Sequence, residues 1–341
     1  MTLIGMLHHR ADPEKVKRSY AYASAAKSEG AEFFYFTAGK VDINRETILG
    51  KKYEDGKWID KEFPFPDVIF NASYPATENG EKIIDHLYER IPFTSHSIGN
   101  KLTVYEKIKN GKQFEQYLIP SAELSNLELL FEMVHSYSKV IIKPLSGNQG
   151  GGILFIEEAE AGTFKINDKG KIYSLDQERL VQSIKDLDEV FLIQPFITCK
   201  TKAGNVFDFR LHVQKAGKGE WVITSIFPRI GPSGSIASNL GGGGYTCYLE
   251  DFLRNEFDHS WFDVKRILEY FAIRFASHFD TLYDQSLDEL GIDVGIDENQ
   301  KLWIFEVNWR PGIPVIFRGE LDVAKNTILY AKYLAAQKSK A

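Results

Sequence analysis

The 341-residue chain is 43% hydrophobic and 26% charged, a composition typical of a globular protein with enough residues for two or three lobes. Its formal net charge of −6 and its scattered lysines and arginines argue against nucleic acid or an anionic membrane as the main partner. Cys199 and Cys247 lack metal or redox spacing and fit buried positions in a reducing compartment. The N-terminal apolar run is too short for a signal peptide and no stretch reaches membrane-span length, so we expect a cytoplasmic protein.

Residues 1–95 alternate between strand and helix patterns and predict a small α/β domain. Asp12, Pro13 and Glu14 form a helix start with a capping residue, a proline in the first turn and an acid beside it. The expected strands cover 2–7, 32–36, 41–60 with a turn at 54–56, 66–71 and 91–94, and the expected helices cover 12–28 and 80–90. This alternation favours a parallel sheet.

The pattern changes from about residue 98, where an α+β region begins. Its expected helices cover 101–110, 124–137 and 177–185, and its expected strands cover 140–144, 152–156 and 191–197. A strand over 208–214 pairs with 221–227, and a Gly/Ser-rich loop follows over 228–245.

A long helix is expected to begin at Ser260, which forms a capping-box pattern with Asp263. Hydrophobic residues at three- and four-residue spacing give this helix a stripe that predicts core packing, namely Val264, Leu268, Phe271, Phe275 and Phe279. A last helix is expected over 323–336.

Residues 290–312 are the most informative stretch and predict a β-hairpin with converging oxygen-bearing side chains. Side chains two apart on a strand share a face, so Glu306 and Asn308 point one way and Phe305 points the other. Counting outward from the turn at 299–300 places Asp293 opposite Glu306. Such oxygens suit Mg²⁺ that bridges to substrate phosphates. The alternative is a half-exposed hairpin whose polar side chains face water.

Lys143 ends an apolar strand and leads into a glycine-rich loop over 144–152. Glycines let backbone N–H groups approach an anion closely, and the lysine could neutralise phosphate charge. No Walker A spacing occurs, and a strand follows the loop where a dinucleotide fingerprint requires a helix. A plain flexible hairpin is the alternative.

The order of these pieces is more specific than any one of them. The lysine and glycine-rich loop precede an apolar strand ending in Gln194, which is followed by the Asp-Phe-Arg strand of Arg210 and then by the Asp…Glu-x-Asn hairpin. This order resembles the ATP-grasp superfamily, in which two α+β lobes hold ATP between them. The stretch DFRLHVQK with a later SNLGGGG most resembles the YheC/YheD-type group of spore-coat-associated proteins.

The resemblance implies an α/β and α+β chain with the ATP-grasp fold in three parts. Residues 1–95 would form an N-terminal α/β pre-domain. Residues 96–190 would form the central lobe with the phosphate loop, and residues 191–341 the C-terminal lobe with the metal-binding hairpin.

The resemblance also implies roles for individual residues. Lys101 and Lys143 match two ATP-binding lysines, and Asn100 stands where an acid is usual. The phosphate loop would include Ser146, Gly147, Gly150 and Gly151, the adenine hinge Gln194, Pro195, Phe196 and Ile197, and the Mg²⁺ ligands Asp293, Glu306 and Asn308. Gln194 replaces the usual hinge glutamate, and residues 198–201 lack the acid that often holds the ribose. Arg310 occupies the place of a motif that faces the acyl substrate.

Other polar residues allow two interpretations, one functional and one structural. Arg210 is expected to contact the γ-phosphate, with a surface ion pair as the alternative. Arg229 and Asn239 fit either a phosphate or substrate clamp or simple loop positions. His8 and His9 are adjacent at a strand end and are expected to face opposite ways, in structural or solvent-facing roles.

The resemblance implies an ATP-dependent carboxylate–amine ligase that forms an acyl phosphate and releases ADP, with Arg210, Lys143 and Arg310 as catalytic residues. ATP and Mg²⁺ would be the cofactors, with Mn²⁺ as an alternative metal. The substrates would be a small-molecule or peptide carboxylate and an amine. A small-molecule kinase and a catalytically inactive, nucleotide-binding spore-coat scaffold are the alternatives. Association with the spore and a homodimer remain open.

Overall fold

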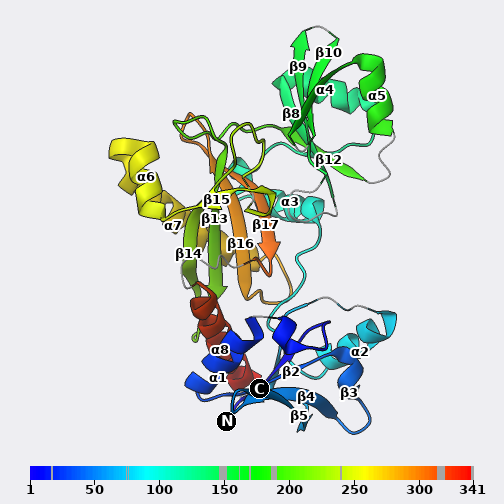
Figure 1. The fold of residues 1–341 in the computed structure, drawn as a ribbon, viewed down its shortest axis with the longest axis vertical. Coiled ribbons are helices and arrows are strands. Elements are labelled where there is room, and N and C mark those ends of the chain that lie inside the picture. Colours follow the sequence, from blue (N-terminus) through cyan, green and yellow to red (C-terminus); the bar gives the residue numbers. More distant parts are fainter. Residues whose placement is uncertain are drawn as a thin grey trace.

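Three sheets organise the described part of the chain, and Figure 1 shows one body around each of them. The computed structural model describes residues 1–341 apart from 17, 74, 76, 146–151, 161, 169, 186–189, 239, 313–318 and 339–341. The bodies are the N-terminal domain at the bottom of Figure 1, the C-terminal lobe in the middle and the central lobe at the top. This mixed α/β architecture confirms the expected fold class.

The N-terminal sheet has a parallel centre and an antiparallel edge. β1 (Leu3–Leu7) lies between β2 (Glu32–Phe36) and β6 (Val68–Asn71), and the three strands run parallel. The other strands pair antiparallel, namely β3 (Val41–Asp42), β4 (Thr47–Glu54) and β5 (Lys57–Pro64). The expected parallel sheet is therefore wrong at this edge. Asp55 and Gly56 both have positive φ, which gives a tight hairpin turn and makes β4 and β5 antiparallel.

Helices cover both faces of the N-terminal sheet. α1 (Arg18–Ser28) and α8 (Gly319–Lys338) pack on one face, and α2 (Glu78–Tyr88) packs on the other. The helix expected from residue 12 begins instead with a 3₁₀ turn over Pro13–Lys15, which Asp12 caps. The strand expected at 91–94 is reduced to a single bridge between Ile69 and Phe93.

The last helix ties the two ends of the chain together. α8 buries Val323, Ala324, Ile328 and Ala331 in the core of the N-terminal domain, and it also contacts β13 of the C-terminal lobe. The N-terminal domain therefore depends on residues from the far end of the sequence for part of its apolar burial.

The central lobe is a six-stranded antiparallel sheet covered by two helices. Its strands are β7 (Ala122–Glu123), β8 (Lys139–Pro144), β9 (Leu154–Glu160), β10 (Thr163–Asp168), β11 (Lys171–Asp176) and β12 (Phe191–Pro195). α4 (Leu127–Tyr137) and α5 (Gln177–Lys185) bury Leu130, Val134 and Leu180 against it. The helix predicted over 177–185 is confirmed.

The C-terminal lobe is a five-stranded antiparallel sheet packed on helices. Its strands are β13 (Phe207–Lys215), β14 (Trp221–Ile230), β15 (Tyr245–Thr246), β16 (Glu289–Ile296) and β17 (Leu302–Trp309). Its helices are α3 (Lys101–Asn110), α6 (Leu249–Phe257) and α7 (Trp261–Asp280). The predicted aromatic stripe of α7 is buried in this core, and α3 adds Val104 and Ile108 to it.

The start of α7 differs from the expected capping box. The Ser260 hydroxyl donates to the Phe257 carbonyl at 2.8 Å and makes no side-chain cap on the helix. The physical reason is that α6, which the sequence analysis missed, ends in a 3₁₀ turn over Asp258–Ser260 that leads directly into α7. The carbonyls of that turn are the nearest acceptors for the serine.

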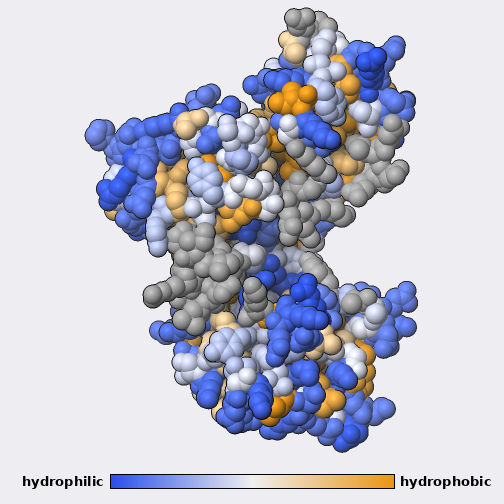
Figure 2. Space-filling view, in the orientation of Figure 1, coloured by the Kyte–Doolittle hydropathy of each residue, from blue (hydrophilic) through white to orange (hydrophobic). Residues whose placement is uncertain are grey.

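The surface is mostly hydrophilic, with scattered hydrophobic residues (Figure 2). None of the helices that the structure describes is both long and apolar enough to cross a membrane.

Asp288 lies buried where the C-terminal lobe meets the segment that leaves the N-terminal domain. The Ser95 hydroxyl donates to its carboxylate at 2.9 Å. Burial, with a further contribution from the neighbouring Glu289, raises the pKa of Asp288 to about 8. The folded protein therefore holds a proton on this carboxyl that the unfolded chain loses at much lower pH.

We expect Asp288→Asn to be more stable than the native chain by an amount that grows as the pH rises from 5 to 8. A folded-state pKa above the ordinary value means that stability falls with rising pH across this window, and an amide has no proton to lose. The upper limit of the slope is about 1.4 kcal/mol per pH unit. Urea unfolding of both proteins at pH 5, 6.5 and 8 measures the difference in stability. A difference that does not change with pH would contradict the raised pKa of Asp288.

Candidate functional site

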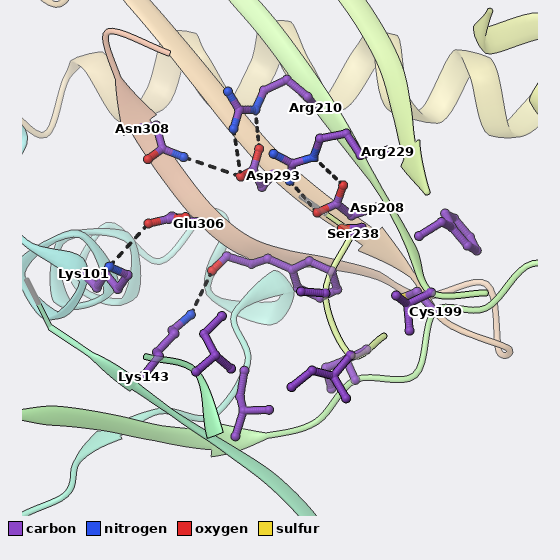
Figure 3. Close-up of a pocket in the computed structure, with 18 of the residues that line it drawn as sticks. Lys101, Lys143, Cys199, Asp208, Arg210, Arg229, Ser238, Asp293, Glu306 and Asn308 are labelled. Carbon is purple, nitrogen blue, oxygen red and sulfur yellow. Dashed lines mark hydrogen bonds and ion pairs between the residues drawn. The ribbon is translucent and has the colours of Figure 1, made fainter. Parts of the chain in front are cut away.

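A cavity of about 640 Å³ lies between the sheets of the central and C-terminal lobes. Apolar side chains line one part of it, including Ile119, Ile141, Phe196, Ile197 and Phe305. Charged side chains line the rest, including Lys101, Lys143, Arg210, Asp293 and Glu306 (Figure 3). Figure 2 shows a notch between the upper parts of the two lobes. The cavity therefore offers one apolar and one charged region to the same ligand.

The hairpin of β16 and β17 has the predicted register at Asp293 but not near its turn, where Ile296 pairs with Leu302 instead of Trp303. Asp293 pairs with Glu306 as expected from the turn position. The register shifts between Asp293 and Val294, which pairs with Ile304, so that Phe305 is an extra residue on β17. The prediction that Phe305 faces away is wrong, because this bulge breaks the alternation and brings Phe305 and Glu306 into one cavity.

Asp293 is the centre of a buried ionic network. Arg210 donates to both carboxylate oxygens, with its terminal nitrogen 3.1 Å from Oδ2, and Arg229 lies 3.0 Å from the same oxygen. Arg229 also makes a two-pronged pair with Asp208, with Nε 2.7 Å from Oδ1. Burial opposes ionisation of Asp293, but the two arginines outweigh it and lower the pKa of this carboxyl. Asp293 is therefore held as an anion.

Two lysines face this network across the cavity (Figure 3). The Lys101 ammonium lies 3.6 Å from the Glu306 carboxylate, and the Lys143 ammonium donates to the Phe305 carbonyl at 3.5 Å. Burial lowers the pKa of Lys143 to about 8, and the nearby Lys101 adds to this. Asn100, which replaces the usual acid, has a structural role, because its side chain caps α3 by accepting from the Thr103 N–H at 2.9 Å.

The predicted hinge, Gln194 to Ile197, lines the cavity where β12 ends. The Phe196 N–H already donates to the Lys139 carbonyl at 2.9 Å. The Phe196 ring packs edge-on against Phe155, with ring centroids 5.0 Å apart. Any hydrogen bond from this segment to a ligand must therefore use other backbone groups, while the Phe196 side chain supplies apolar contact.

The donor set of Asp293, Glu306 and Asn308 fits a hard divalent cation. All three offer oxygen atoms, line one cavity and sit on one hairpin, and the Asn308 amide nitrogen lies 3.5 Å from Asp293 Oδ2. Within the described ranges, no three His, Cys, Asp or Glu side chains form a metal-binding group. The set predicted here includes an asparagine and therefore falls outside that description. The ligand assignment stays a prediction.

Some expected site residues lie outside the described part of the chain, namely Ser146, Gly147, Gly150, Gly151 and Asn239. Arg310 lies on the cavity wall directly after β17, with its guanidinium carbon 3.8 Å from the centre of the Trp309 ring. Its φ of 55° turns the chain sharply at this point.

Asp208 and Arg229 are the buried pair that the sequence analysis missed. β13 and β14 pair Asp208 directly with Arg229, but the partner strand was expected to end at residue 227. The equal strands 208–214 and 221–227 imply Asp208 opposite Phe227, whereas the observed ladder, with a register shift between His212 and Val213, places Asp208 opposite Arg229. The β-bulge that sets this register has no signal in the strand pattern of the sequence, so the pair could not have been found by counting.

Comparison with known proteins identifies the family. The pattern of the YheC/D-like ATP-grasp family matches residues 90–334. The chain belongs to this family. The YheC/D-like chain is 29% identical over 328 residues to the endospore coat-associated protein YheD of Bacillus subtilis (strain 168), covering 90% of this chain and 71% of YheD. It is 22% identical over 313 residues to YheC of the same organism, covering 87% of this chain and 85% of YheC.

Solved structures share the fold of this YheC/D-like chain. D-alanyl-alanine synthetase A from Vibrio cholerae matches with a TM-score of 0.59 at 13% identity and covers 100% of this chain and 99% of its own. A RiPP-associated ATP-grasp ligase from Chryseobacterium gregarium, solved with ADP and a leader and core peptide, matches with a TM-score of 0.53 at 13% identity and covers 100% and 98%. These similarities show that the chain has the ATP-grasp fold.

We expect the predicted metal ligands to differ in their effect on stability. Asp293→Ala should destabilise the protein by about 3–5 kcal/mol, because it leaves Arg210 and Arg229 buried without their shared carboxylate. Glu306→Ala should cost less than about 1 kcal/mol, because Glu306 is one-third exposed and its pair with Lys101 is correspondingly screened. Unfolding in guanidinium chloride measures the loss of stability in each variant. A loss in Asp293→Ala no larger than the small loss in Glu306→Ala would show that the Asp293 network does not stabilise the fold.

Proposed function

We propose that this protein is an ATP-dependent carboxylate–amine ligase that acts through an acyl phosphate. The observation that carries the proposal is the single cavity with an apolar hinge region at one end and Lys101, Lys143 and Arg210 at the other. A nucleoside triphosphate has the same division into an apolar base and a polyanionic tail. The ADP bound in the Chryseobacterium ligase supports this choice of nucleotide.

The apolar and charged regions of the cavity support one orientation of ATP. Phe196, Ile197 and Phe305 would enclose the adenine, and the lysines with Arg210 would neutralise the phosphates. Asp293, Glu306 and Asn308 would hold Mg²⁺, or Mn²⁺, which supplies positive charge to the phosphate oxygens when bound. Arg210 would then stand between its partner Asp293 and the γ-phosphate, where charge develops during transfer.

The proposed chemistry takes place in two steps. A carboxylate oxygen of the substrate attacks the γ-phosphorus, the bond to the bridging oxygen of ADP breaks, and an acyl phosphate forms. The amine nitrogen then attacks the acyl carbon, loses a proton and releases inorganic phosphate, which leaves an amide. Lys143 and Arg210 stabilise the transferred group, and Arg310 would orient the acyl substrate at the cavity wall. No side chain acts as a nucleophile in this scheme.

The names of the two Bacillus relatives support a place in the spore coat or near it. We propose a peptide or small-molecule acid as the substrate, in keeping with the peptide bound by the Chryseobacterium ligase.

We expect Mg·ATP to be converted to ADP only when both a carboxylic acid and an amine are present, as measured by coupled ADP release with pooled acids and amines. Glu306→Ala should lower this rate by about a hundredfold or more, since it removes a charge that positions the phosphates. Glu298→Ala, in the exposed turn of the same hairpin, is the matched control.

The alternatives give different outcomes in the same assay. Phosphorylation of a hydroxyl compound in the absence of an amine would show that the protein is a kinase and not a ligase. A melting temperature raised by Mg·ATP without turnover of any acid, amine or hydroxyl compound would favour the catalytically inactive, nucleotide-binding scaffold. A melting temperature unchanged by Mg·ATP, Mg·ADP and Mg·GTP would contradict the ligase and the kinase together, because ligand at a hundred times Kd stabilises by about 2.7 kcal/mol.

We expect ADP affinity to fall as the pH rises from 7 to 9.5, because Lys143 loses its proton near pH 8 and with it the charge that attracts phosphate. Lys143→Met should bind ADP about tenfold more weakly at pH 7 and lose most of this pH dependence. Lys139→Met, an exposed lysine on the same strand, should behave like the native chain. Calorimetric titration at several pH values measures both effects, and an unchanged pH profile in Lys143→Met would exclude Lys143 as the titrating group.

A further inference from the structure

A group of polar side chains gathers at the carboxyl ends of β1 and β6. His8, His9 and Arg10 follow β1, and Ser73 follows β6, which lies parallel beside it with Leu7 opposite Asn71. We call these four residues the strand-end cluster. The chain leaves β1 toward β2 on one side of the sheet and returns at β6 on the other. In open α/β sheets this point of reversal is where ligands bind.

The geometry of the strand-end cluster is defined by hydrogen bonds and ring stacking. The His8 and His9 rings stack with centroids 4.5 Å apart, so the expectation that they face opposite ways is wrong. Ser73 Oγ accepts from the His9 backbone N–H at 2.8 Å and lies 3.0 Å from His9 Nδ1. His8 Nδ1 accepts from the Arg10 N–H at 3.0 Å. These bonds hold the exposed His9 ring, while the exposed Arg10 side chain donates to the Lys15 carbonyl at 3.3 Å.

The surroundings of the cluster are cationic. Burial lowers the pKa of His8 to about 4, and the charges of His9, Arg10, Arg18 and Arg310 act in the same direction. No described acid is among the groups that shift it. Cationic side chains from two parts of the chain therefore act on His8, since Arg310 belongs to the C-terminal lobe, while the Asp12 carboxylate acts on Tyr35, whose ring stacks on His8.

Asn71 provides a separate sign of a ligand at this place. It is the last residue of β6 and is only 6% exposed. Its amide nitrogen donates to the Tyr88 hydroxyl at 3.2 Å and to the Ser95 carbonyl at 3.3 Å. Its buried Oδ1 has no hydrogen-bond partner among the described residues, which leaves an acceptor for an N–H or O–H group.

Arg310 connects the cluster with the nucleotide cavity. It lines that cavity two residues beyond Asn308, and its charge also reaches His8 and Tyr88 of the N-terminal domain. In Figure 1 the arrow of β17, which ends just before Arg310, points toward the N-terminal domain. A substrate whose reacting carboxylate lies beside Arg310 would therefore extend toward the strand-end cluster.

We propose that the strand-end cluster binds a second acid group of the acyl substrate, a carboxylate or a phosphate, so that the enzyme selects substrates with two acid groups. This proposal rests on the ligase function proposed above, which supplies the reacting carboxylate. His9 and Arg10 would donate to the second acid group, and Asn71 Oδ1 would accept from a neighbouring N–H or O–H of the same substrate.

The test is calorimetric titration of the full chain, saturated with Mg·ADP, with α,ω-dicarboxylates of three to eight carbons, the corresponding ω-phosphonocarboxylates and monocarboxylates of equal length. We expect at least one two-acid series to bind more tightly than its monocarboxylates. His9→Ala and Arg10→Ala should each weaken that binding about tenfold, since a hydrogen bond to a charged group is worth at least this factor. Preference between carboxylate and phosphonate identifies the second acid group.

Lys27→Ala is the matched control, because Lys27 is an exposed cation of the same domain at the far end of α1. Binding of Mg·ADP is measured first in every variant and should be unchanged. Normal Mg·ADP binding without any preference for two acid groups, or with a preference that survives His9→Ala and Arg10→Ala, would overturn this inference and leave the ligase intact. A native chain that does not bind Mg·ADP would overturn the proposed function instead.

Discussion

The carboxylate of Asp293 is buried between two guanidinium groups, and the geometry of the site depends on this arrangement. Arg210 comes from β13, Arg229 from β14 and Asp293 from β16, so one charge cluster joins three neighbouring strands. Buried charges of this kind persist only when each has a partner, because desolvation is otherwise too costly. The same requirement places the Arg210 cation next to a predicted metal ligand, so a group that stabilises the fold is also one that the proposed phosphate site needs.

The β-bulge at Phe305 has a comparable double role. It lets Glu306 stay opposite Asp293 while Phe305 turns into the cavity, so a charged ligand-binding group and an apolar wall come from consecutive residues. The Phe305 carbonyl also accepts from Lys143 of the central lobe. One irregularity in one strand thus brings an apolar and a charged side chain into the same cavity and links the two lobes, as the proposed nucleotide site requires.

The N-terminal domain is tied to this site from both ends of the chain. α8 packs beside α1, and Asp288, next to the first residue of β16, is bonded to Ser95 where the chain leaves the N-terminal domain. Arg310, which follows the hairpin, lies near enough to His8 at the end of β1 for its charge to lower the pKa of that histidine. The proposed nucleotide, the reacting carboxylate and the second acid group would therefore lie along one path from the hinge to the N-terminal sheet.

The sequence by itself determined the pairing of Asp293 with Glu306, the helix that carries the core stripe and the identity of the charged residues. Strand alternation and helical spacing are local properties, so Asp293 opposite Glu306 and the buried stripe of α7 followed from counting. Only the tertiary structure decided the Asp208–Arg229 pair, the inward turn of Phe305, the stacking of His8 on His9 and the return of α8 to the N-terminal domain. Each of these depends on a bulge, an extended ladder or a contact between distant segments, and burial and charge pairing across the whole fold select among the local options.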